Sequence, residues 1–270
     1  MRKNIIASVI LTCIILFIPN YSYSWTTTTR WDPDNMDGWY AWDSGWGMPT
    51  VGATLIPAQP DGNTRTLRIT IPKGAEATGY LFGGASRPFP STEEVWAQFY
   101  LLFPNNYKFH TVTDKFSGWG KWPGESNNLV VTFGNGEWGV MPQNDWPGFW
   151  QGFYPTESNV PATRQKNHWY KIVQHLKMNT PGKFDGIYEM WVDDQLVMRH
   201  NNVGYREAGN NTGFTGIRHL VVWGGITNSI FQDEETYVYY GTSTVSSQNL
   251  GTIPTSIGKE PMAPTKITIK

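Results

Sequence analysis

Six polar side chains that can transfer a proton or hydrogen-bond a substrate lie on predicted strands, at positions expected to face away from the core. They are Gln98, Tyr100, His175, Lys177, Tyr237 and Tyr239. Gln both donates and accepts hydrogen bonds, His and Lys can serve as bases, and Tyr can serve as an acid. The set is therefore sufficient in kind for general acid–base catalysis without a metal ion. We predict these six as catalytic candidates.

A second group of side chains could hold a ligand. A Trp ring has a flat apolar face that matches the C–H face of a pyranose, and the chain has 14 Trp, so carbohydrate is indicated even though most of these Trp are expected in the core. The predicted ligand contacts are Trp96, His110, Lys115, Trp119, Trp122, Glu189 and Trp191. On a regular strand His110 and Lys115 would face opposite sides. Trp119 and Trp122 lie in a Gly-rich stretch that predicts a loop walling a cleft.

Paired carboxylates for glycoside hydrolysis are missing from the pattern. Glu93 and Glu94 are adjacent and would point to opposite faces of a strand. Glu189 and Asp193 share a face but would be roughly 13 Å apart by strand rise, which is wider than either hydrolase mechanism uses. No Gly-x-Ser-x-Gly motif is present to position a serine nucleophile. A hydrolase is therefore disfavoured.

Alternation along strands positions the candidates. In 94–103, Val, Ala, Phe and Leu occupy one side, whereas Trp96, Gln98 and Tyr100 occupy the other. Further strands are predicted at 64–72, 217–223 and 237–240, with a hairpin at 128–133 and 138–141 and a loop beginning at 81–84 that runs through Pro88 and Pro90. The regular recurrence of strands between Gly and Pro predicts a sandwich or barrel.

The stretch 169–194 is the most informative part of the chain. Two runs rich in Val, Ile, Tyr and Trp flank Asn179-Thr-Pro-Gly182 and Asp185-Gly186, which is turn chemistry. An antiparallel pair is expected. Alternation puts His175, Lys177, Glu189 and Trp191 on a polar side, and Gln174 is the polar exception on the apolar side.

This pattern, with Lys177, Asn179-Thr-Pro-Gly, Asp185-Gly and Trp191-Val-Asp, resembles the paired strands of bacterial concanavalin A-like jelly rolls. It is most similar to the polysaccharide-lyase branch, families 14 and 20. The resemblance implies an all-β jelly-roll sandwich of two antiparallel sheets with a concave substrate face. Lys115-Phe116 followed by Gly118 and Gly120 resembles the Lys-Leu-Pro-Gly-Leu stretch of those families, with Ser117 in place of the Pro.

Tyr237-x-Tyr239 resembles the C-terminal tyrosines of jelly-roll lyases, one of which serves as acid or base, although relatives often have Asp where this chain has Tyr239 or Tyr240. Such lyases cleave uronate-containing polysaccharides by β-elimination. The uronate carboxylate is neutralised, a base removes the C5 proton, and an acid protonates the departing oxygen. The resemblance therefore implies a metal-independent lyase.

Two non-catalytic alternatives remain: a secreted carbohydrate-binding protein, and an adhesin or structural jelly roll. The binding protein needs the same aromatic face without acid and base. His175 discriminates between them. If its ring is stacked or hydrogen-bonded as a structural residue, the binding protein is favoured.

The first 24 residues predict a signal peptide. Arg2 and Lys3 precede an apolar run at 5–18, and Ser22-Tyr-Ser24 supplies the small residues of a cleavage site. We expect a secreted or periplasmic protein with a jelly-roll domain at 25–248 and a Pro/Thr-rich tail at 249–270. The one cysteine, Cys13, lies in the signal peptide, so no disulfide is expected in the mature chain.

Charge limits the partners. Without Arg2 and Lys3 the 21 basic residues become 19 against 22 acidic ones, a net charge of −3. This balance disfavours nucleic acid and gives no general attraction for a polyanion. We expect a polysaccharide partner, no membrane association after signal cleavage, and a monomer. No cofactor is expected. A structural calcium at Asp32, Asp34 and Asn35 is the one metal site considered, because hard cations take oxygen ligands.

Overall fold

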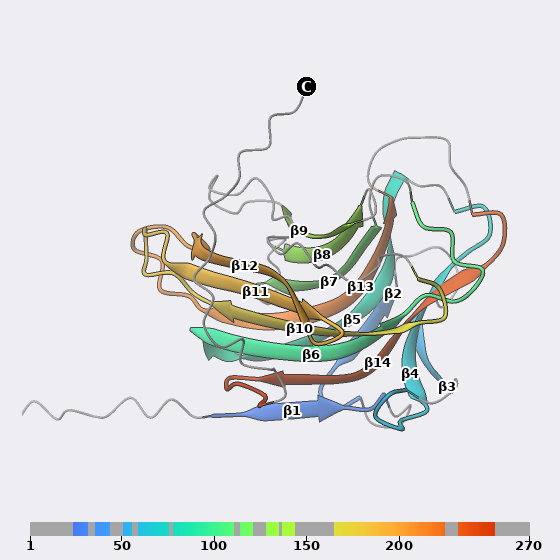
Figure 1. Cartoon of the computed structure of the whole chain (residues 1–270), viewed down its shortest axis with the longest axis horizontal. Coiled ribbons are helices and arrows are strands. Elements are labelled where there is room, and N and C mark those ends of the chain that lie inside the picture. The colour runs from blue at the N-terminus through green and yellow to red at the C-terminus, as the bar shows by residue number, and fades with distance from the viewer. Residues whose placement is uncertain are drawn as a thin grey trace, which may run out of the picture.

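Two antiparallel sheets form the molecule (Figure 1). The computed structural model describes residues 24–31, 36–43, 51–55, 59–75, 78–110, 114–120, 128–134, 137–143, 165–224 and 232–251. The predicted signal peptide up to residue 23, the calcium candidates, Trp122 and the tail from 252 onward lie outside these residues. No helix in the described ranges is long and apolar enough to cross a membrane.

The eight-stranded sheet contains the 94–103 and 169–194 strands. Its spatial order is β12 (Gln195–Val203), β11 (Gly186–Val192), β10 (Trp169–Lys177), β6 (Glu94–Leu102), β14 (Thr236–Ser246), β4 (Arg65–Ile71) and β3 (Val51–Leu55), and β1 (Thr26–Thr29) pairs with the C-terminal half of β14. The antiparallel pair predicted in 169–194 is therefore correct, and the last predicted strand lies next to β6.

The six-stranded sheet has the order β2 (Tyr40–Asp43), β5 (Thr78–Thr92), β13 (Phe214–Gly224), β7 (Asp114–Gly120), β8 (Asn128–Gly134) and β9 (Glu137–Gln143). In Figure 1 the strands of both sheets bend upward at the right of the view, with β7, β8 and β9 on the upper side. The outer face of each sheet means here the side turned away from the other sheet. The all-β jelly-roll sandwich predicted from the sequence is confirmed.

One predicted loop is a strand. Residues 81–90, interpreted as a loop because of Pro88 and Pro90, lie within β5. Strand β2 pairs with β5 only from Gly83 to Ser86. Beyond Ser86, β5 pairs only with β13 among the described strands. On its other edge no described strand is paired, so the missing N–H of a proline costs no hydrogen bond between strands there.

The space between the sheets is filled mainly by aromatic side chains. Trp31, Trp119, Trp138 and Trp223 are fully buried, as are several Tyr and Phe rings. Trp119 was predicted to line a cleft, and this is wrong. Ser117 has a positive φ of 41° and forms an irregularity in β7, which shifts the alternation so that both Phe116 and Trp119 face the core.

His110, predicted as a ligand contact, is also in the interior. It is fully buried, its ring packs edge-on against Trp223, and its backbone N–H donates to Asp114. It precedes β7 instead of belonging to it, so strand alternation does not govern its direction.

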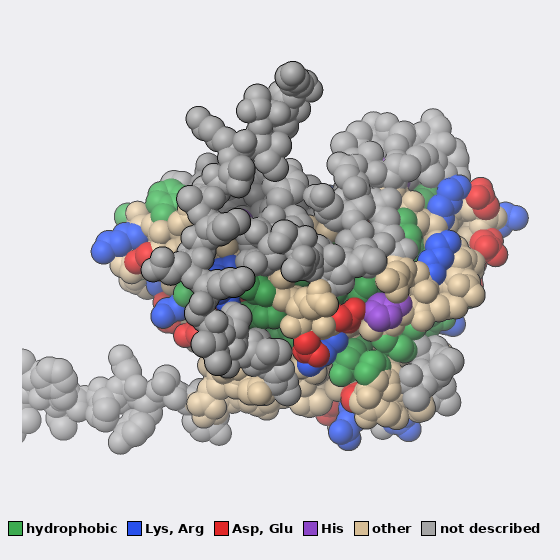
Figure 2. Space-filling view, in the orientation of Figure 1, with side chains coloured by type: hydrophobic (Ala, Val, Ile, Leu, Met, Phe, Trp, Pro, Cys, Tyr) green, Lys and Arg blue, Asp and Glu red, His purple; other side chains and the backbone are tan. Residues whose placement is uncertain are grey.

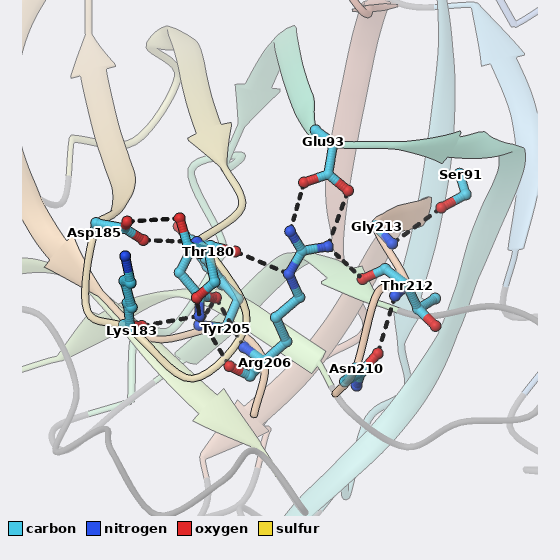
Figure 3. A network of polar contacts seen from close by, with 11 residues as sticks. Ser91, Glu93, Thr180, Lys183, Asp185, Tyr205, Arg206, Asn210, Thr212 and Gly213 are labelled. Atoms are coloured by element: carbon cyan, nitrogen blue, oxygen red, sulfur yellow. Dashed lines mark hydrogen bonds and ion pairs between the residues drawn. The ribbon is translucent and has the colours of Figure 1, made fainter. Parts of the chain in front are cut away.

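Asn179 explains why the turn after β10 is so distinctive, and Figure 3 shows two residues of the same network, Arg206 and Glu93, joined by an ion pair. Its side-chain amide is fully buried, donates to the carbonyl oxygens of Thr180, Lys183 and Arg206, and accepts the N–H groups of Tyr205 and Arg206. Arg206 in turn donates to the Asn179 carbonyl and forms a two-pronged ion pair with Glu93. The motif therefore joins the β10–β11 turn, the 205–206 segment and the start of β6.

We expect Asn179→Ala to lower the free energy of unfolding by about 2–4 kcal/mol, because the buried backbone N–H groups of Tyr205 and Arg206 lose the side-chain oxygen that accepts them. The measurement is urea unfolding of the purified domain. Asn210→Ala is the matched control, since Asn210 accepts one exposed N–H, and it should cost less than about 1 kcal/mol. Equal, small effects in both variants would contradict this role for Asn179.

Candidate functional site

The six catalytic candidates lie on the outer face of the eight-stranded sheet. Their strands are β6 for Gln98 and Tyr100, β10 for His175 and Lys177, and β14 for Tyr237 and Tyr239. Residue pairs across the strands fix their spacing. His175 lies opposite Trp96, whereas Tyr239 lies opposite Leu102, six residues further along β6. Six residues of strand span roughly 20 Å, so His175 and the tyrosine pair cannot act on one glycosidic bond.

His175 is held as a structural residue. Its ring stacks on Trp96 with a centroid distance of 3.8 Å and an interplanar angle of 8°. Nδ1 lies 2.8 Å from Glu189 and Nε2 lies 2.8 Å from Glu94. Both ring nitrogens are therefore engaged by the protein itself, and the residue is only 6% exposed.

Glu189 completes a row of charges across β10, β11 and β12. Arg199, on β12, donates to the second Glu189 oxygen. Burial raises the pKa of Glu189, but the hydrogen bonds from His175 and Arg199, together with their charges, outweigh burial and leave the pKa below its usual value. Glu189, predicted to contact ligand, is thus a partner in an internal ion-pair network.

The two tryptophans predicted to form a sugar platform are covered. Trp96 is 7% exposed and Trp191 is 4% exposed, and with Val173 they form a small cluster. Leu196 of β12 and Leu250, which follows β14, pack against this cluster. Strand alternation placed the two rings correctly outside the main core, but the chain's own C-terminal segment occupies the surface that a sugar would need.

The tyrosines at the other end of this face are more accessible. The rings of Tyr237 and Tyr239 are 5.9 Å apart, and the Arg68 guanidinium lies 4.9 Å from the Tyr237 centroid. The Tyr237 hydroxyl donates to Glu235, and this hydrogen bond is the main cause that raises the Tyr237 pKa. Burial raises the pKa of Tyr239 and of Tyr100. Raised values make these phenols poorer acids.

Lys115, which was predicted as a ligand contact, lies on the six-stranded sheet and not on the sheet that carries the six catalytic candidates. It is on β7 opposite Val222 of β13, on the outer face of the six-stranded sheet. Ile217, His219, Val221 and Trp223 belong to the buried interior, so Arg218, Leu220 and Val222 alternate outward beside it. The sequence predicted one groove, but the structure divides its candidates between two faces that point in opposite directions.

The amino group of Lys115 is partly buried and has no ion-pair partner among the described residues. Desolvation lowers its pKa, because burial disfavours the charged form of the amine. A lysine of this kind holds a larger neutral fraction near neutral pH and can remove a proton. No group of three or more His, Cys, Asp or Glu in the described part of the chain could hold a metal ion.

Charges of both signs are interspersed over the described surface in Figure 2, without a large field of one sign. Among the described strands of the six-stranded sheet, the cations on the outer face are Lys115 and Arg218, and Arg218 is a residue that the sequence reasoning missed. Arg218 carries no motif of its own, and only the pairing of β13 with β7 reveals that it shares a face with Lys115.

Comparison with known proteins shows which families the chain resembles. Residues 162–243, from the segment before β10 to most of β14, match the family model described as Polysaccharide lyase 14. This match and the fold confirm the predicted resemblance to the polysaccharide-lyase branch of the concanavalin A-like superfamily. A search of curated proteins finds no match.

Solved structures share the fold over most of the chain. The PL-14 alginate lyase from Aplysia kurodai is 15% identical with a TM-score of 0.58, covering 83% of this chain and 98% of that one. The alginate lyase from Chlorella virus is 12% identical with a TM-score of 0.57, covering 73% and 89%. The endo-β-1,4-glucuronan lyase from Trichoderma reesei is 12% identical with a TM-score of 0.54, covering 82% and 95%. At these identities the likeness establishes the fold.

The lowered pKa of Lys115 can be measured directly. After reductive ¹³C-methylation, we expect one lysine NMR signal to titrate at lower pH than the main group of lysine signals, because desolvation disfavours its charge. Lys115→Arg should remove that signal, whereas Lys177→Arg, which changes an exposed lysine on the other sheet, should leave it in place. If the Lys115 signal titrates with the main group, the amine is solvated and the site assignment is wrong.

Proposed function

We propose that this protein is a secreted, metal-independent polysaccharide lyase that acts by β-elimination on a uronate-containing chain, bound on the outer face of the six-stranded sheet. The observation that carries the proposal is Lys115, a partly buried amine with a lowered pKa and no carboxylate partner among the described residues. The match to Polysaccharide lyase 14 and the shared fold with alginate and glucuronan lyases support the reaction class.

Lys115 can supply both proton transfers. In its neutral form the amine removes the C5 proton of the uronate, and the electron pair left behind moves into the developing double bond as the bond from C4 to the glycosidic oxygen breaks. The resulting ammonium then protonates the departing oxygen, which returns the neutral amine. Protons balance without a second acid, and a positioned general base contributes about 10²–10⁴-fold to the rate. Neutralisation of the uronate carboxylate falls to a cation on the same face.

The first test is an ultraviolet assay for the unsaturated product, using residues 25–270 and a panel of alginate, glucuronan, pectate, hyaluronan and heparin-like chains. We expect rising absorbance with at least one polyuronate, and no change on adding EDTA because the proposed proton transfers need no metal. If none of these polymers gives the unsaturated product, the proposal that the protein is a lyase is rejected.

Lys115→Ala should reduce the rate by about 10²–10⁴-fold, since the proton acceptor is removed. In the unmutated enzyme the rate should rise with pH, because only the neutral amine is a base, and half-maximal rate should fall below the ordinary lysine pKa of 10.5. His175→Gln, on the opposite sheet, is the control and should keep most activity once folding is verified. A rate that depends on His175 and not on Lys115 would move the reaction to the other face.

One observation favours the second candidate, a non-catalytic carbohydrate-binding protein. His175 is stacked on Trp96 and hydrogen-bonded at both nitrogens, which is the structural role that distinguishes a binding protein from a lyase using this histidine. Retention on a polysaccharide affinity gel with no product from any polymer in the panel would establish this alternative.

A further inference from the structure

A row of outward-facing side chains crosses four strands of the eight-stranded sheet, at the end of the sheet opposite to the His175 network. The register pairs Trp169 of β10 with Leu102 of β6, and Leu102 with Tyr239 of β14. Tyr239 in turn lies opposite Arg68 of β4. All four point to the outer face, because residues next to them in sequence belong to the core between the sheets. These four residues are called the Trp169 row below.

The Trp169 row is open, whereas the aromatic rings further along the same face are covered. Its four side chains are half-buried, and so is Tyr237, two residues before Tyr239 on β14. By contrast, Trp96 and Trp191 are only 7% and 4% exposed, and Leu250 packs against them. Aromatic surface on this face is therefore accessible at the Trp169 row and not at the Trp96 cluster.

The rings at the β14 end of this surface are held in place by their neighbours. The centroids of Tyr237 and Tyr239 are 5.9 Å apart, and the Arg68 guanidinium lies 4.9 Å from the Tyr237 centroid. The Tyr237 hydroxyl donates to the carboxylate of Glu235, which precedes β14 and lies off the row. A ligand that contacts these rings does not have to order them first, and this lowers the free-energy cost of binding.

Arg68 brings a positive charge that no carboxylate of the described residues neutralises. Lys171, two residues from Trp169 on β10, is instead paired with Asp194 at 2.7 Å. A guanidinium that stacks on an aromatic ring keeps its N–H groups at its edge, where they match the two oxygens of a carboxylate. The row therefore combines flat apolar rings with one cation that is free to bind an acidic group.

The dimensions of the row fit a polysaccharide chain. Neighbouring strands are about 4.8 Å apart, so the three steps from Trp169 to Arg68 span roughly 14 Å. Each step is close to the length of one pyranose unit, and the faces of Trp and Tyr rings can pack against the C–H faces of sugars. Five half-buried side chains offer much less than the about 800 Å² that each partner of a stable protein complex buries. A glycan lying across the strands is therefore favoured over a protein partner.

We propose that the Trp169 row and Tyr237 form a second polysaccharide-binding site, which holds a uronate-containing chain by stacking on Trp169 and Tyr239 and by an ion pair with Arg68. This site goes beyond the proposed function, because it lies on the sheet opposite to Lys115 and binds its ligand without reacting with it. A polymer held there stays close to the protein, so its local concentration at the Lys115 face rises.

The test is affinity electrophoresis of the full protein carrying Lys115→Ala, which prevents cleavage, in gels that contain alginate or glucuronan. Parallel gels contain the carboxyl-reduced, neutral polymers. Adding Trp169→Ala or Tyr239→Ala should weaken retention in both kinds of gel by about two- to tenfold, because a stacking surface is lost. Adding Arg68→Gln should weaken retention by about threefold or more in the acidic gels and leave it unchanged in the neutral ones, because a charge-assisted contact is lost.

Phe184→Ala and Lys183→Gln are the matched controls. They remove one ring, which is 51% exposed, and one exposed charge from the turn between β10 and β11, and retention should not change. Unchanged retention in all three row variants overturns the inference, and so does an equal loss for Arg68→Gln on acidic and neutral polymers. Sedimentation that shows self-association lost in the row variants identifies a protein interface and also overturns it. Arg68→Gln removes no ring, so the test remains valid if a ring variant unfolds.

Failure of the proposed function can be told apart from failure of this site. If the unmutated protein gives no unsaturated product but the row variants lose retention, the lyase is rejected and the binding site is supported. If short uronate oligomers are cleaved, the row variants should cleave them at the unmutated rate, because an oligomer of a few units cannot reach both faces. An equal fall in rate on oligomers and polymer contradicts the separate site. A protein that neither cleaves nor retains any polyuronate contradicts both proposals.

Discussion

The interior between the two sheets constrains every other feature of this molecule. With its one cysteine in the predicted signal peptide, the domain depends on a dry aromatic core for stability. That core takes alternate residues of each strand, so polar chemistry is confined to the two outer faces, and these point in opposite directions. Residues on different sheets cannot cooperate at one bond, however suitable their types are. The division of the candidates into a His175 group and a Lys115 group follows from this constraint alone.

The few polar groups inside the sandwich tie the sheets together. Gln174 accepts from the indole of Trp119 at 2.9 Å and donates to the Tyr188 hydroxyl at 2.7 Å, which satisfies its amide across the interior. The Tyr240 hydroxyl donates to Leu220 and accepts from the N–H of Ser117. This second link lies at the irregularity that turns Trp119 inward, so an internal hydrogen bond from the eight-stranded sheet holds the place in β7 where the alternation changes.

Local patterns predicted most of this architecture. Alternation in 94–103 and 169–194, together with the Asn179 turn, defined the strands and their inner faces, because such signals depend on neighbouring residues. Three features depended on distant ones. The pairing of β6 with β14 needs contacts between residues far apart in the chain. The change of parity at Ser117 requires a positive φ that no residue type signalled. The covering of Trp96 and Trp191 by Leu250 depends on the path of a segment after the last strand. For the same reason the candidate residues could be named from sequence, whereas their grouping could not.

The two outer faces differ in how their charges are compensated. On the eight-stranded sheet, His175, Glu94, Glu189 and Arg199 satisfy one another, and the adjacent indoles are covered, so the arrangement is complete as a structural unit. On the six-stranded sheet, Lys115 is partly desolvated without a carboxylate partner among the described residues. Such an ammonium weakens the folded state, because burial disfavours its charge and no carboxylate among the described residues offsets that cost. Residues that cost stability in this way cluster at functional sites, where the perturbed pKa is what the chemistry requires. The uncompensated lysine, more than the many aromatic rings, is therefore the strongest physical reason to place function on the six-stranded sheet.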